Sequence, residues 1–338
     1  MQQKPKIQFA VAGCGHIGKR HIEMIQRNSE AELVAVCDIN PAISIDGLET
    51  RPYRCLEELL ESTEFDVLNI CTPNGIHAPM AIRGLETNHH VVIEKPMSLT
   101  TIDAEKILQT AEKHNKKVFC VMQNRYSPPS VWIKDVIDHQ LLGRIFVVQI
   151  NCFWNRDERY YQKGGWHGSK DLDGGTLFTQ FSHFIDLMFW LFGDITNIQA
   201  RFADFNHQQL TDFEDSGAVS FEFVHGGIGT FNYSTSIYDV NFESSVTIIG
   251  EKGTIKIGGQ YMNQVEYCRV KDYIMPELAP TNPGNDYGAY KGSAQNHHYV
   301  IDNVVNVLKN KAGEKITTNA YEGYKVVDII ERMYKEKS

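Results

Sequence analysis

The sequence predicts an α/β protein: a doubly wound parallel sheet first, then a second domain built around antiparallel strands. Three observations lead to this prediction. Short apolar segments alternate with amphipathic helical segments as far as about Val121, which is typical of a parallel sheet covered on both faces. Beyond Gln123, segments with a two-residue apolar period replace that pattern. The chain has 338 residues, too many for one ordinary core, so we predict two domains, 1–122 and 123–338.

The elements of the first domain follow from the apolar runs and the signals that bound them. Thr100 and Asp103 have the spacing of a capping box, which predicts that a helix begins there. Strands are expected at 7–12, 33–37, 66–71, 91–93 and 118–121, and helices at 17–27, 76–86 and 100–114.

The second domain is expected to begin with one long helix and to continue as an antiparallel meander. The helix is predicted at 176–192, and glycine turns at 226–227 and 251–253 separate the strands. The strands are expected at 219–223, 245–249 and 254–257, a long loop at 276–292, and closing helices at 294–309 and 321–335.

Composition excludes several classes of function. The net charge of −9 disfavours a nucleic-acid or anionic-membrane partner. No apolar run approaches the roughly 20 residues of a membrane span, and we find no signal peptide, so a cytoplasmic protein is expected. The seven cysteines are scattered without a CxxC pair, as free thiols in a reducing compartment would be. No metal-ligand spacing such as HExxH is present, so no metal site is predicted.

A glycine fingerprint follows the first strand and opens the first helix. Gly13 permits the tight turn, Gly15 lets the backbone approach a pyrophosphate, and Gly18 lets helix and strand pack closely. The helix N-terminus supplies amide donors for phosphate. Asp38 ends the next strand, where its carboxylate can accept a hydrogen bond from a ribose hydroxyl and would repel a 2′-phosphate. Residues 39–41 offer no cation, so the sequence predicts NAD rather than NADP.

Two further patterns place polar groups where packing does not require them. Lys95 follows a buried strand and precedes Pro96, and its ammonium needs a partner or a cavity. The predicted helix 176–192 is mostly apolar and yet carries a polar stripe at spacings of three and four. A polar stripe on a buried helix must be satisfied, and a substrate pocket is one way to satisfy it. The stripe consists of Thr176, Thr179, Gln180, His183 and Asp186.

In combination these motifs resemble the Gfo/Idh/MocA family of NAD(P)-dependent sugar and polyol oxidoreductases. The matching segments are Gly13-x-Gly15-x-x-Gly18, Cys71-Thr72-Pro73-Asn74-x-x-His77, Glu94-Lys95-Pro96, and Gly174-Gly175 through His183-x-x-Asp186. The resemblance implies a Rossmann domain and a C-terminal substrate-binding domain whose large open antiparallel sheet mediates homo-oligomerisation as a dimer or tetramer. It also implies that Lys95 and His183 face the substrate. Many members carry Asp-x-x-x-His on this helix, but Thr179 occupies the Asp position here, which weakens assignment to the inositol dehydrogenases.

Finer matches resemble the subgroup that oxidises UDP-N-acetylglucosaminuronate at its 3-hydroxyl for surface-polysaccharide synthesis. These matches are Gln123 through Pro129, Arg159-Tyr160-Tyr161 with Gly165-Trp166-His167-Gly168, Thr179-Gln180-x-x-His183, and Gly292-Ser293-Ala294-x-Asn296-His297. The residues that this resemblance assigns to the cofactor are Gly13, Gly15, His16, Ile17, Gly18, Asp38, Thr72, Pro73, Asn74, His77, Glu94, Lys95, Gln123 and Trp166. Those that it assigns to the substrate are Asn124, Arg125, Tyr126, Arg159, Tyr160, Thr179, Gln180 and His183.

The charge of such a substrate requires cations, since it carries a diphosphate and a carboxylate. Candidate cations are Arg125, Arg156, Arg159 and Lys163, because guanidinium and ammonium groups match these anions. Each of them could equally be a solvated surface charge. Tyr160, Tyr161 and Trp166 are candidates to cover a uracil or sugar face, or simply to pack.

The expected chemistry removes the hydroxyl proton of the substrate while a hydride passes to the nicotinamide. His183 is the favoured base because its unperturbed pKa lies near neutrality, and Lys95 would then stabilise the developing negative charge on oxygen. The reverse assignment, with a desolvated neutral Lys95 as base, is also open. Other possible functions are a dehydrogenase of another sugar or of inositol, an NAD-dependent redox glycosidase, and a non-catalytic nucleotide sensor.

Overall fold

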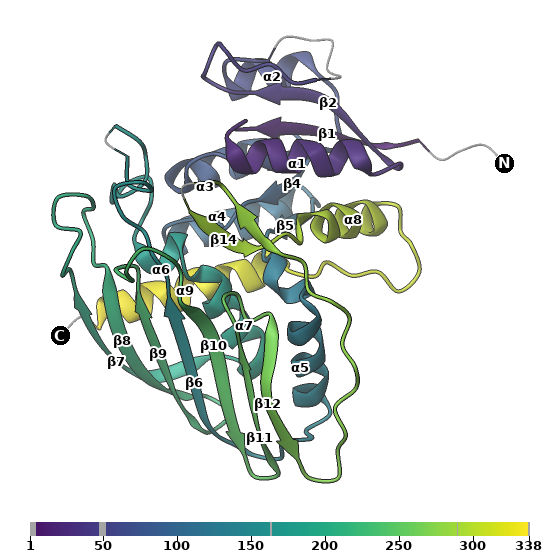
Figure 1. The fold of residues 1–338 in the computed structure, drawn as a ribbon. Coiled ribbons are helices and arrows are strands. Elements are labelled where there is room, and N and C mark those ends of the chain that lie inside the picture. The colour runs from purple at the N-terminus through teal and green to yellow at the C-terminus, as the bar shows by residue number, and fades with distance from the viewer. Residues whose placement is uncertain (1–4, 47–51, 163, 289, 337–338) are drawn as a thin grey trace. The chain divides into compact units, whose positions relative to one another are not determined.

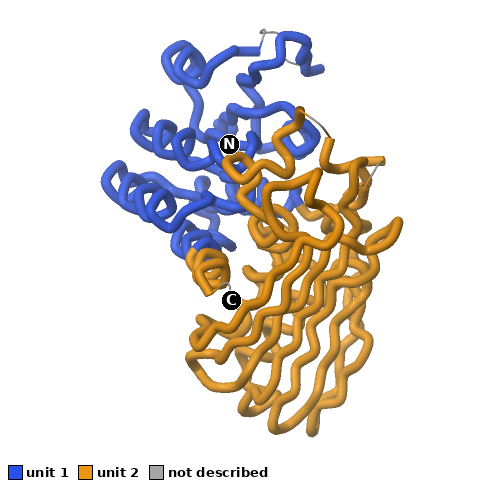
Figure 2. The backbone as a smooth tube through the Cα atoms, turned by 90° about the vertical axis from the view of Figure 1, so that its left-hand side faces the viewer, with its two compact units in different colours: residues 1–121, 297–327 blue, residues 122–296, 328–338 orange. Residues whose placement is uncertain are grey.

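The computed structural model describes residues 5–46, 52–162, 164–288 and 290–336. They divide into two compact units, 1–121 with 297–327, and 122–296 with 328–338 (Figure 2). No helix among the described residues is long and apolar enough to cross a lipid bilayer.

Unit 1 is built around a five-stranded parallel sheet with the strand order β2-β1-β3-β4-β5 (Figure 1). The strands are β1 Ile7–Ala12, β2 Ala31–Cys37, β3 Val67–Ile70, β4 His90–Ile93 and β5 Val118–Cys120. Its helices are α1 His16–Arg27, α2 Leu56–Ser62, α3 His77–Glu86, α4 Thr101–Lys113 and α8 His297–Leu308. The strand order reverses between β1 and β3, so right-handed crossovers place α1 and the α3/α4 pair on opposite faces.

The core of unit 1 confirms the prediction of a sheet buried on both faces. Every residue of β3 is buried, as are the last three of β4 and all of β5. Thr100 caps α4, because its hydroxyl accepts a hydrogen bond from the Asp103 amide at 3.1 Å. Because all five strands are parallel, their carboxyl ends lie at the same end of the sheet, where ligands bind in sheets of this kind.

Residues 297–327 belong to unit 1, which corrects the predicted boundary of 123–338 for the second domain. Helix α8 packs on α1, and Lys309 pairs with Glu30 at 2.9 Å. The Cys120 amide donates to the Thr318 carbonyl at 2.9 Å, so the chain after α8 continues the hydrogen bonding at the β5 edge. The sequence did not predict that residues 297–327 pack with unit 1, because local patterns carry no information on contacts between distant segments.

Unit 2 contains a seven-stranded mixed sheet with the order β12-β11-β10-β6-β9-β8-β7. All neighbouring pairs are antiparallel except β6 and β9, which run parallel. The strands are β6 Ile145–Phe153, β7 Ile195–Ala203, β8 Ser216–Phe223, β9 Ile228–Ser234, β10 Glu243–Gly250, β11 Gly253–Gly258 and β12 Gln264–Val270. Four of these, β6, β7, β9 and β12, were not predicted from the sequence.

The remaining elements of unit 2 include two corrections. The predicted helix 176–192 is interrupted, giving α6 Thr176–Thr179 and α7 Ser182–Phe192, because the amides of Gln180 and Phe181 both donate to the Thr176 carbonyl. The predicted loop 276–292 contains β13 Gly284–Asp286 and leads into β14 Lys291–Ala294, which pair as a hairpin.

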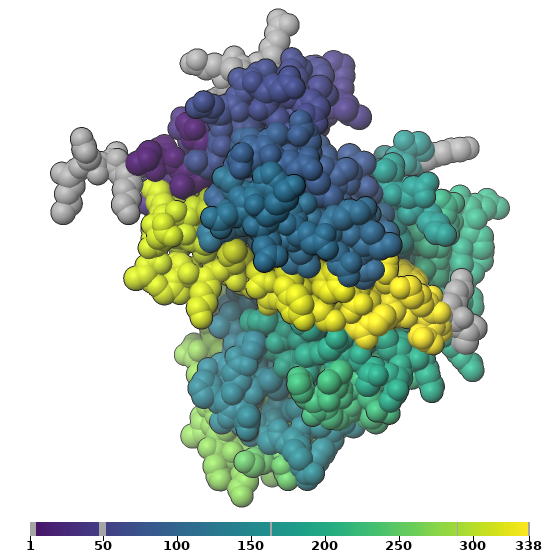
Figure 3. All heavy atoms as spheres, turned by 180° about the vertical axis from the view of Figure 1, so that it is seen from behind, coloured from purple at the N-terminus to yellow at the C-terminus, as the bar shows by residue number. Residues whose placement is uncertain are grey.

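Helices cover one face of the unit 2 sheet. The ring of Phe192 at the end of α7 contacts that of Phe223 on β8, with centroids 5.3 Å apart. Helix α5, Pro128–Asp138, packs against α7. The last helix, α9 Ala320–Lys335, contributes residues to both units, and the yellow segment of Figure 3 presents its outer side to solvent.

Candidate functional site

The glycine turn between β1 and α1 has the geometry that a dinucleotide requires. Gly13 has φ +88°, and a Cβ there would lie 2.6 Å from the Cys71 carbonyl oxygen. A Cβ on Gly18 would lie 1.8 Å from the Gly13 carbonyl oxygen, so neither position admits a side chain. Gly15 has open space within 4 Å of its Cβ direction, which leaves room for a phosphate at the helix N-terminus. His16 and Ile17 begin α1 directly after it.

Asp38 lies beside this turn, as predicted. One carboxylate oxygen accepts from the Cys14 amide at 2.7 Å and the other from the Asn40 amide at 2.7 Å. Arg54 also lies here and was not predicted from the sequence. Its guanidinium donates hydrogen bonds to the backbone carbonyls of Asp38, Asn40 and Pro41. Arg54 is sixteen positions from Asp38, which is why residues 39–41 gave no sign of it.

The segment after β3 carries the second group of residues that the sequence predicts to contact the cofactor. Asn74 opens a short 3-10 turn, η1 Asn74–Ile76, and is buried. The imidazole of His77 is buried between two carbonyls: Nδ1 lies 2.8 Å from the Pro96 oxygen and Nε2 lies 2.8 Å from the Thr72 oxygen. Burial lowers the pKa of His77, although both backbone bonds act in the opposite direction. His77 therefore joins the carboxyl ends of β3 and β4.

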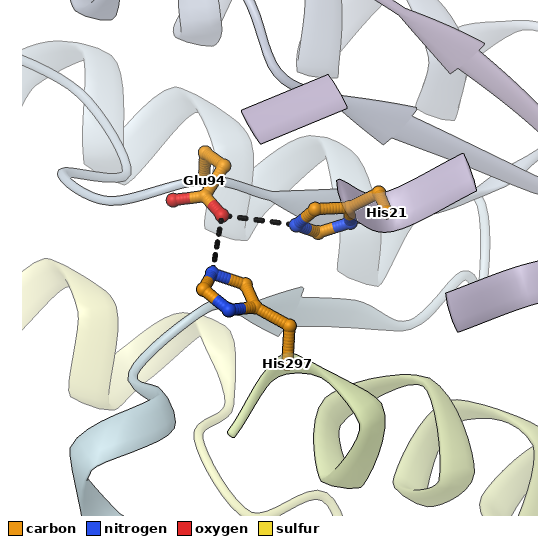
Figure 4. Close-up of side chains that lie close together, drawn as sticks. All are labelled: His21, Glu94 and His297. Atoms are coloured by element: carbon orange, nitrogen blue, oxygen red, sulfur yellow. Dashed lines mark hydrogen bonds and ion pairs between the residues drawn. The ribbon is translucent and has the colours of Figure 1, made fainter. Parts of the chain in front are cut away.

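Glu94 has protein partners that the sequence did not predict. Its side chain is 7% exposed, and Oε1 lies 2.9 Å from His21 Nε2 and 3.5 Å from His297 Nε2 (Figure 4). Oε2 accepts from the Lys95 amide at 3.1 Å. Burial alone would raise the pKa of Glu94, but the bonds from both imidazoles outweigh it and hold this pKa well below its usual range. These bonds to His21, His297 and the Lys95 amide were not predicted from the sequence, and the expected contact of Glu94 with the cofactor stays a prediction. Lys95 itself is half-buried.

The stability of the protein is expected to fall in acid. Burial lowers the pKa of His297 below its ordinary 6.5, so protons favour the unfolded chain as the pH falls through that value. The depressed pKa of Glu94 adds stability above 4.5 that is lost below it. His89 and His90 act in the same direction, the latter with a pKa of about 4.

We expect the thermal midpoint of the wild type to drop steadily between neutrality and the pKa range of the carboxylates, and His297→Gln to flatten that dependence. Thermal unfolding followed by circular dichroism measures both. An identical pH slope in the variant would contradict the assignment.

In unit 2, the polar stripe predicted on helix 176–192 exists, and every member is at most 5% exposed. The Thr179 hydroxyl donates to the carboxylate of Asp173 and lies 2.9 Å from the Asp173 carbonyl oxygen. The second carboxylate oxygen accepts from the Gly168 amide at 2.8 Å. A buried carboxylate is thus present beside position 179, although it comes from the preceding loop. His183 is the second residue of α7 and is 3% exposed.

Gln180 links two other candidate substrate residues. Its carbonyl oxygen accepts from Arg156 Nε at 2.7 Å, and its amide nitrogen donates to the Tyr160 hydroxyl at 2.8 Å. The guanidinium of Arg156 is 4.8–5.2 Å from the centroids of three aromatic rings, those of Trp154, Tyr160 and Tyr290. Its other acceptors are the neutral oxygens of Asn155, Asn241 and Lys291. Burial lowers the pKa of Arg156.

The remaining predicted cations and aromatics differ in exposure. Arg159 is 43% exposed and binds the Asp157 carboxylate at 2.7 Å. Tyr161 is buried, and the half-buried ring of Trp166 lies 3.8 Å from that of His167. Lys163 lies outside the described residues.

Two buried amides open the second unit in the short turn η2, Gln123–Tyr126. Asn296 Nδ2 donates to the Gln123 backbone carbonyl at 3.3 Å, and Asn124 Nδ2 lies 3.5 Å from the Ser293 hydroxyl. The side-chain oxygens of Gln123 and Asn124 have no hydrogen-bond partner within the described residues. Two buried amide oxygens in one turn are suited to a polar ligand, since a buried acceptor without a donor is costly.

Arg125 of the same turn forms a buried ion pair. Nε and Nη2 donate to the two oxygens of Asp186 at 2.8 and 2.7 Å, and both side chains are at most 1% exposed. This pairing uses much of the guanidinium that the sequence analysis had assigned to the substrate. It also explains Asp186, the last member of the polar stripe.

Breaking this pair is expected to destabilise unit 2. Because Arg125→Met leaves a buried carboxylate without its counter-charge, it should cost about 3–5 kcal/mol. Arg144→Met is the matched control, since its pair with Glu251 is exposed and should contribute little. Thermal unfolding midpoints measure both, and equal shifts in the two variants would refute the structural role of Arg125.

Family models match both parts of the chain. The model described as "Oxidoreductase family, NAD-binding Rossmann fold" covers residues 7–122, and that of the GFO/IDH/MocA C-terminal domain covers residues 131–256. The glycine turn, the open position at Gly15 and Asp38 fit NAD.

Solved structures and a curated relative extend this similarity. The WlbA dehydrogenase from Bordetella pertussis, in complex with NADH and UDP-GlcNAcA, is 30% identical with a TM-score of 0.87, covering 98% of this chain and 96% of that one. The WlbA dehydrogenase from Chromobacterium violaceum, with the same ligands, is 30% identical with a TM-score of 0.86, covering 99% and 96%. The inositol 2-dehydrogenase of Salmonella typhimurium LT2 is 24% identical over 259 residues, 74% of each chain. The chain therefore belongs to the GFO/IDH/MocA oxidoreductase family and is an NAD-dependent oxidoreductase.

Proposed function

We propose that this protein oxidises the 3-hydroxyl of UDP-N-acetylglucosaminuronate (UDP-GlcNAcA) with NAD, in the synthesis of surface-polysaccharide sugars. The observation that carries the proposal is the pair of WlbA structures, which hold NADH and UDP-GlcNAcA and align with 98–99% of this chain at 30% identity. The Gln123–Tyr126 turn supports it, because the buried side-chain oxygens of Gln123 and Asn124 have no hydrogen-bond partner among the described residues.

The proposed mechanism divides the work between Lys95 and His183. Bound NAD accepts the hydride from the carbon that carries the hydroxyl. His183 takes the hydroxyl proton, and Lys95 donates a hydrogen bond to the oxygen as negative charge develops there. The opposite division, with Lys95 neutral and acting as base, uses the same two residues, and a pH profile of kcat/KM separates the two.

Recognition of the acidic nucleotide sugar is assigned to groups that follow β6. Arg156 is a buried cation bonded to neutral acceptors, so its positive charge favours an anion nearby. Arg159 is partly exposed and can exchange Asp157 for a phosphate. Tyr160 and Gln180 complete this polar group.

Two further properties belong to the proposal, the oligomeric state and the location. A homo-oligomer is inferred from the resemblance and from the exposed apolar side chains of Ile228 and Ile249, which lie on the two strands beside β6 and both pair with Val147. Light scattering measures its mass.

A cytoplasmic location follows from the use of NAD and a nucleotide sugar.

The second candidate function is oxidation of a free polyol, which the inositol dehydrogenase relatives favour. The deciding experiment mixes the purified protein with NAD and either UDP-GlcNAcA, UDP-GlcNAc or myo-inositol, and follows NADH absorbance. The same reactions are repeated with 2-oxoglutarate, to detect turnover when NADH stays bound. We expect oxidation of UDP-GlcNAcA alone. Oxidation of myo-inositol without oxidation of UDP-GlcNAcA would replace the proposal.

A further inference from the structure

Three segments of unit 1 meet at the Glu94 carboxylate. His21 comes from α1, whose N-terminus carries the glycine turn; Glu94 follows β4; and His297 begins α8 (Figure 4). All three side chains are at most 7% exposed, and the two imidazoles meet edge to face with centroids 5.6 Å apart. We call these residues the Glu94 cluster.

The protons of the cluster can be placed from its contacts. The Asn69 amide nitrogen lies 3.0 Å from His21 Nδ1, and an amide NH2 group only donates. Nδ1 is therefore an acceptor, so the ring proton of His21 is on Nε2, where it donates to Glu94. With His297 Nε2 and the Lys95 amide, the carboxylate has three N–H groups around it.

We propose that the Glu94 cluster positions Lys95 for its contact with the substrate oxygen and couples that lysine to the helix that carries the cofactor turn. The proposal rests on the proposed function, in which Lys95 acts on the substrate oxygen. The carboxylate is bonded to the Lys95 backbone amide, and it is itself held by one residue from α1 and one from α8. A shift of either helix is therefore transmitted to the backbone of Lys95.

Packing alone does not account for these residues. Replacing a buried charged group by apolar side chains of similar volume is often neutral or stabilising, so a carboxylate retained here has another use. The charged and titratable groups around it are Arg20, which acts on His297, and Cys71, His77 and Lys95 near the strand ends. His77 experiences the charges of both Glu94 and Lys95, so these two charges lie in one electrostatic environment.

A metal ion is the competing explanation. The ligand atoms of His21, Glu94 and His297 lie within 4.8 Å of one another. However, a metal ligand must present a lone pair, and the Asn69 contact leaves His21 Nε2 protonated. The N–O separation of 2.9 Å between His21 and Glu94 is that of a direct hydrogen bond.

The test compares Glu94→Gln and His297→Gln with His89→Gln. His89 is the matched control, because it is also a buried histidine of unit 1 but precedes β4, at the opposite end of the strand from Glu94. Lys95 is labelled with acetic anhydride from neutral to alkaline pH, and its peptide is quantified by mass spectrometry. NADH affinity, thermal midpoint and kcat with UDP-GlcNAcA are measured on the same proteins.

We expect Glu94→Gln to move the midpoint of Lys95 labelling to lower pH, because removing a nearby negative charge disfavours the ammonium. NADH affinity should be retained, and kcat should fall roughly 10- to 100-fold. His297→Gln should show a smaller change of the same sign, and His89→Gln none.

The proposal would be overturned if the pH midpoint of Lys95 labelling in both Glu94→Gln and His297→Gln equals that of the wild type. Stoichiometric binding of zinc that depends on His21 and His297 would also overturn it. Labelling does not use the sugar substrate. A protein inactive toward UDP-GlcNAcA whose Lys95 still responds to Glu94→Gln would support the positioning role and reject only the proposed substrate.

Discussion

Replacing Lys95 with alanine is expected to lower kcat by at least roughly a hundredfold while NADH still binds. The ammonium is the one group that the proposal places on the substrate oxygen as it gains negative charge. The cofactor turn, made by Gly13, Gly15 and Gly18, does not depend on that side chain. Stopped-flow measurement of NADH formation gives kcat, and fluorescence titration gives the NADH affinity.

The matched control is Lys113→Ala, which removes an exposed lysine near the end of α4. It should leave kcat, KM and the thermal midpoint unchanged. Near-wild-type turnover of the Lys95 variant would remove Lys95 from the reaction and would also remove the purpose assigned to the Glu94 cluster.

His183→Asn is expected to have an effect of similar size, at least roughly a hundredfold on kcat, because the alcohol proton then lacks its base. Asparagine retains a polar group of similar reach on α7, so the fold and NADH affinity should be preserved. The acidic limb of the kcat/KM profile should disappear if His183 is the base.

An exposed histidine provides the comparison for this variant. His139→Asn, just after α5, should behave as the wild type. If His183→Asn keeps the full rate but the Lys95 variant does not, the base is Lys95 and the division of roles is reversed.

Much of unit 1 could be predicted from the sequence because its signals are local. The strand Ile7–Ala12 was predicted to the residue, since its mostly apolar run begins after Lys6 and ends at the glycine turn. The Gly13 and Gly18 requirements are also local: a Cβ at either position would meet backbone within 3 Å. In unit 2, the alternation of buried Val219, Phe221 and Phe223 was correctly interpreted as one face of a strand.

What the sequence could not predict depends on contacts between distant segments. Glu94 and His297 are 203 positions apart, and only the fold brings their side chains together. Asp173 places a buried carboxylate beside Thr179, which a comparison of motifs at position 179 does not detect. The ion pair of Arg125 with Asp186 joins residues 61 positions apart, and no local pattern indicated it.

The most direct measurement uses UDP-GlcNAcA carrying deuterium at C3 of the sugar, incubated with the wild-type protein and NAD. We predict that the deuterium appears on the nicotinamide ring, or in 2-hydroxyglutarate when 2-oxoglutarate is supplied, and that the sugar gains a ketone at C3. The Lys95→Ala protein should transfer almost none. Retention of the deuterium on the sugar under conditions in which the same preparation oxidises myo-inositol would contradict the proposed function.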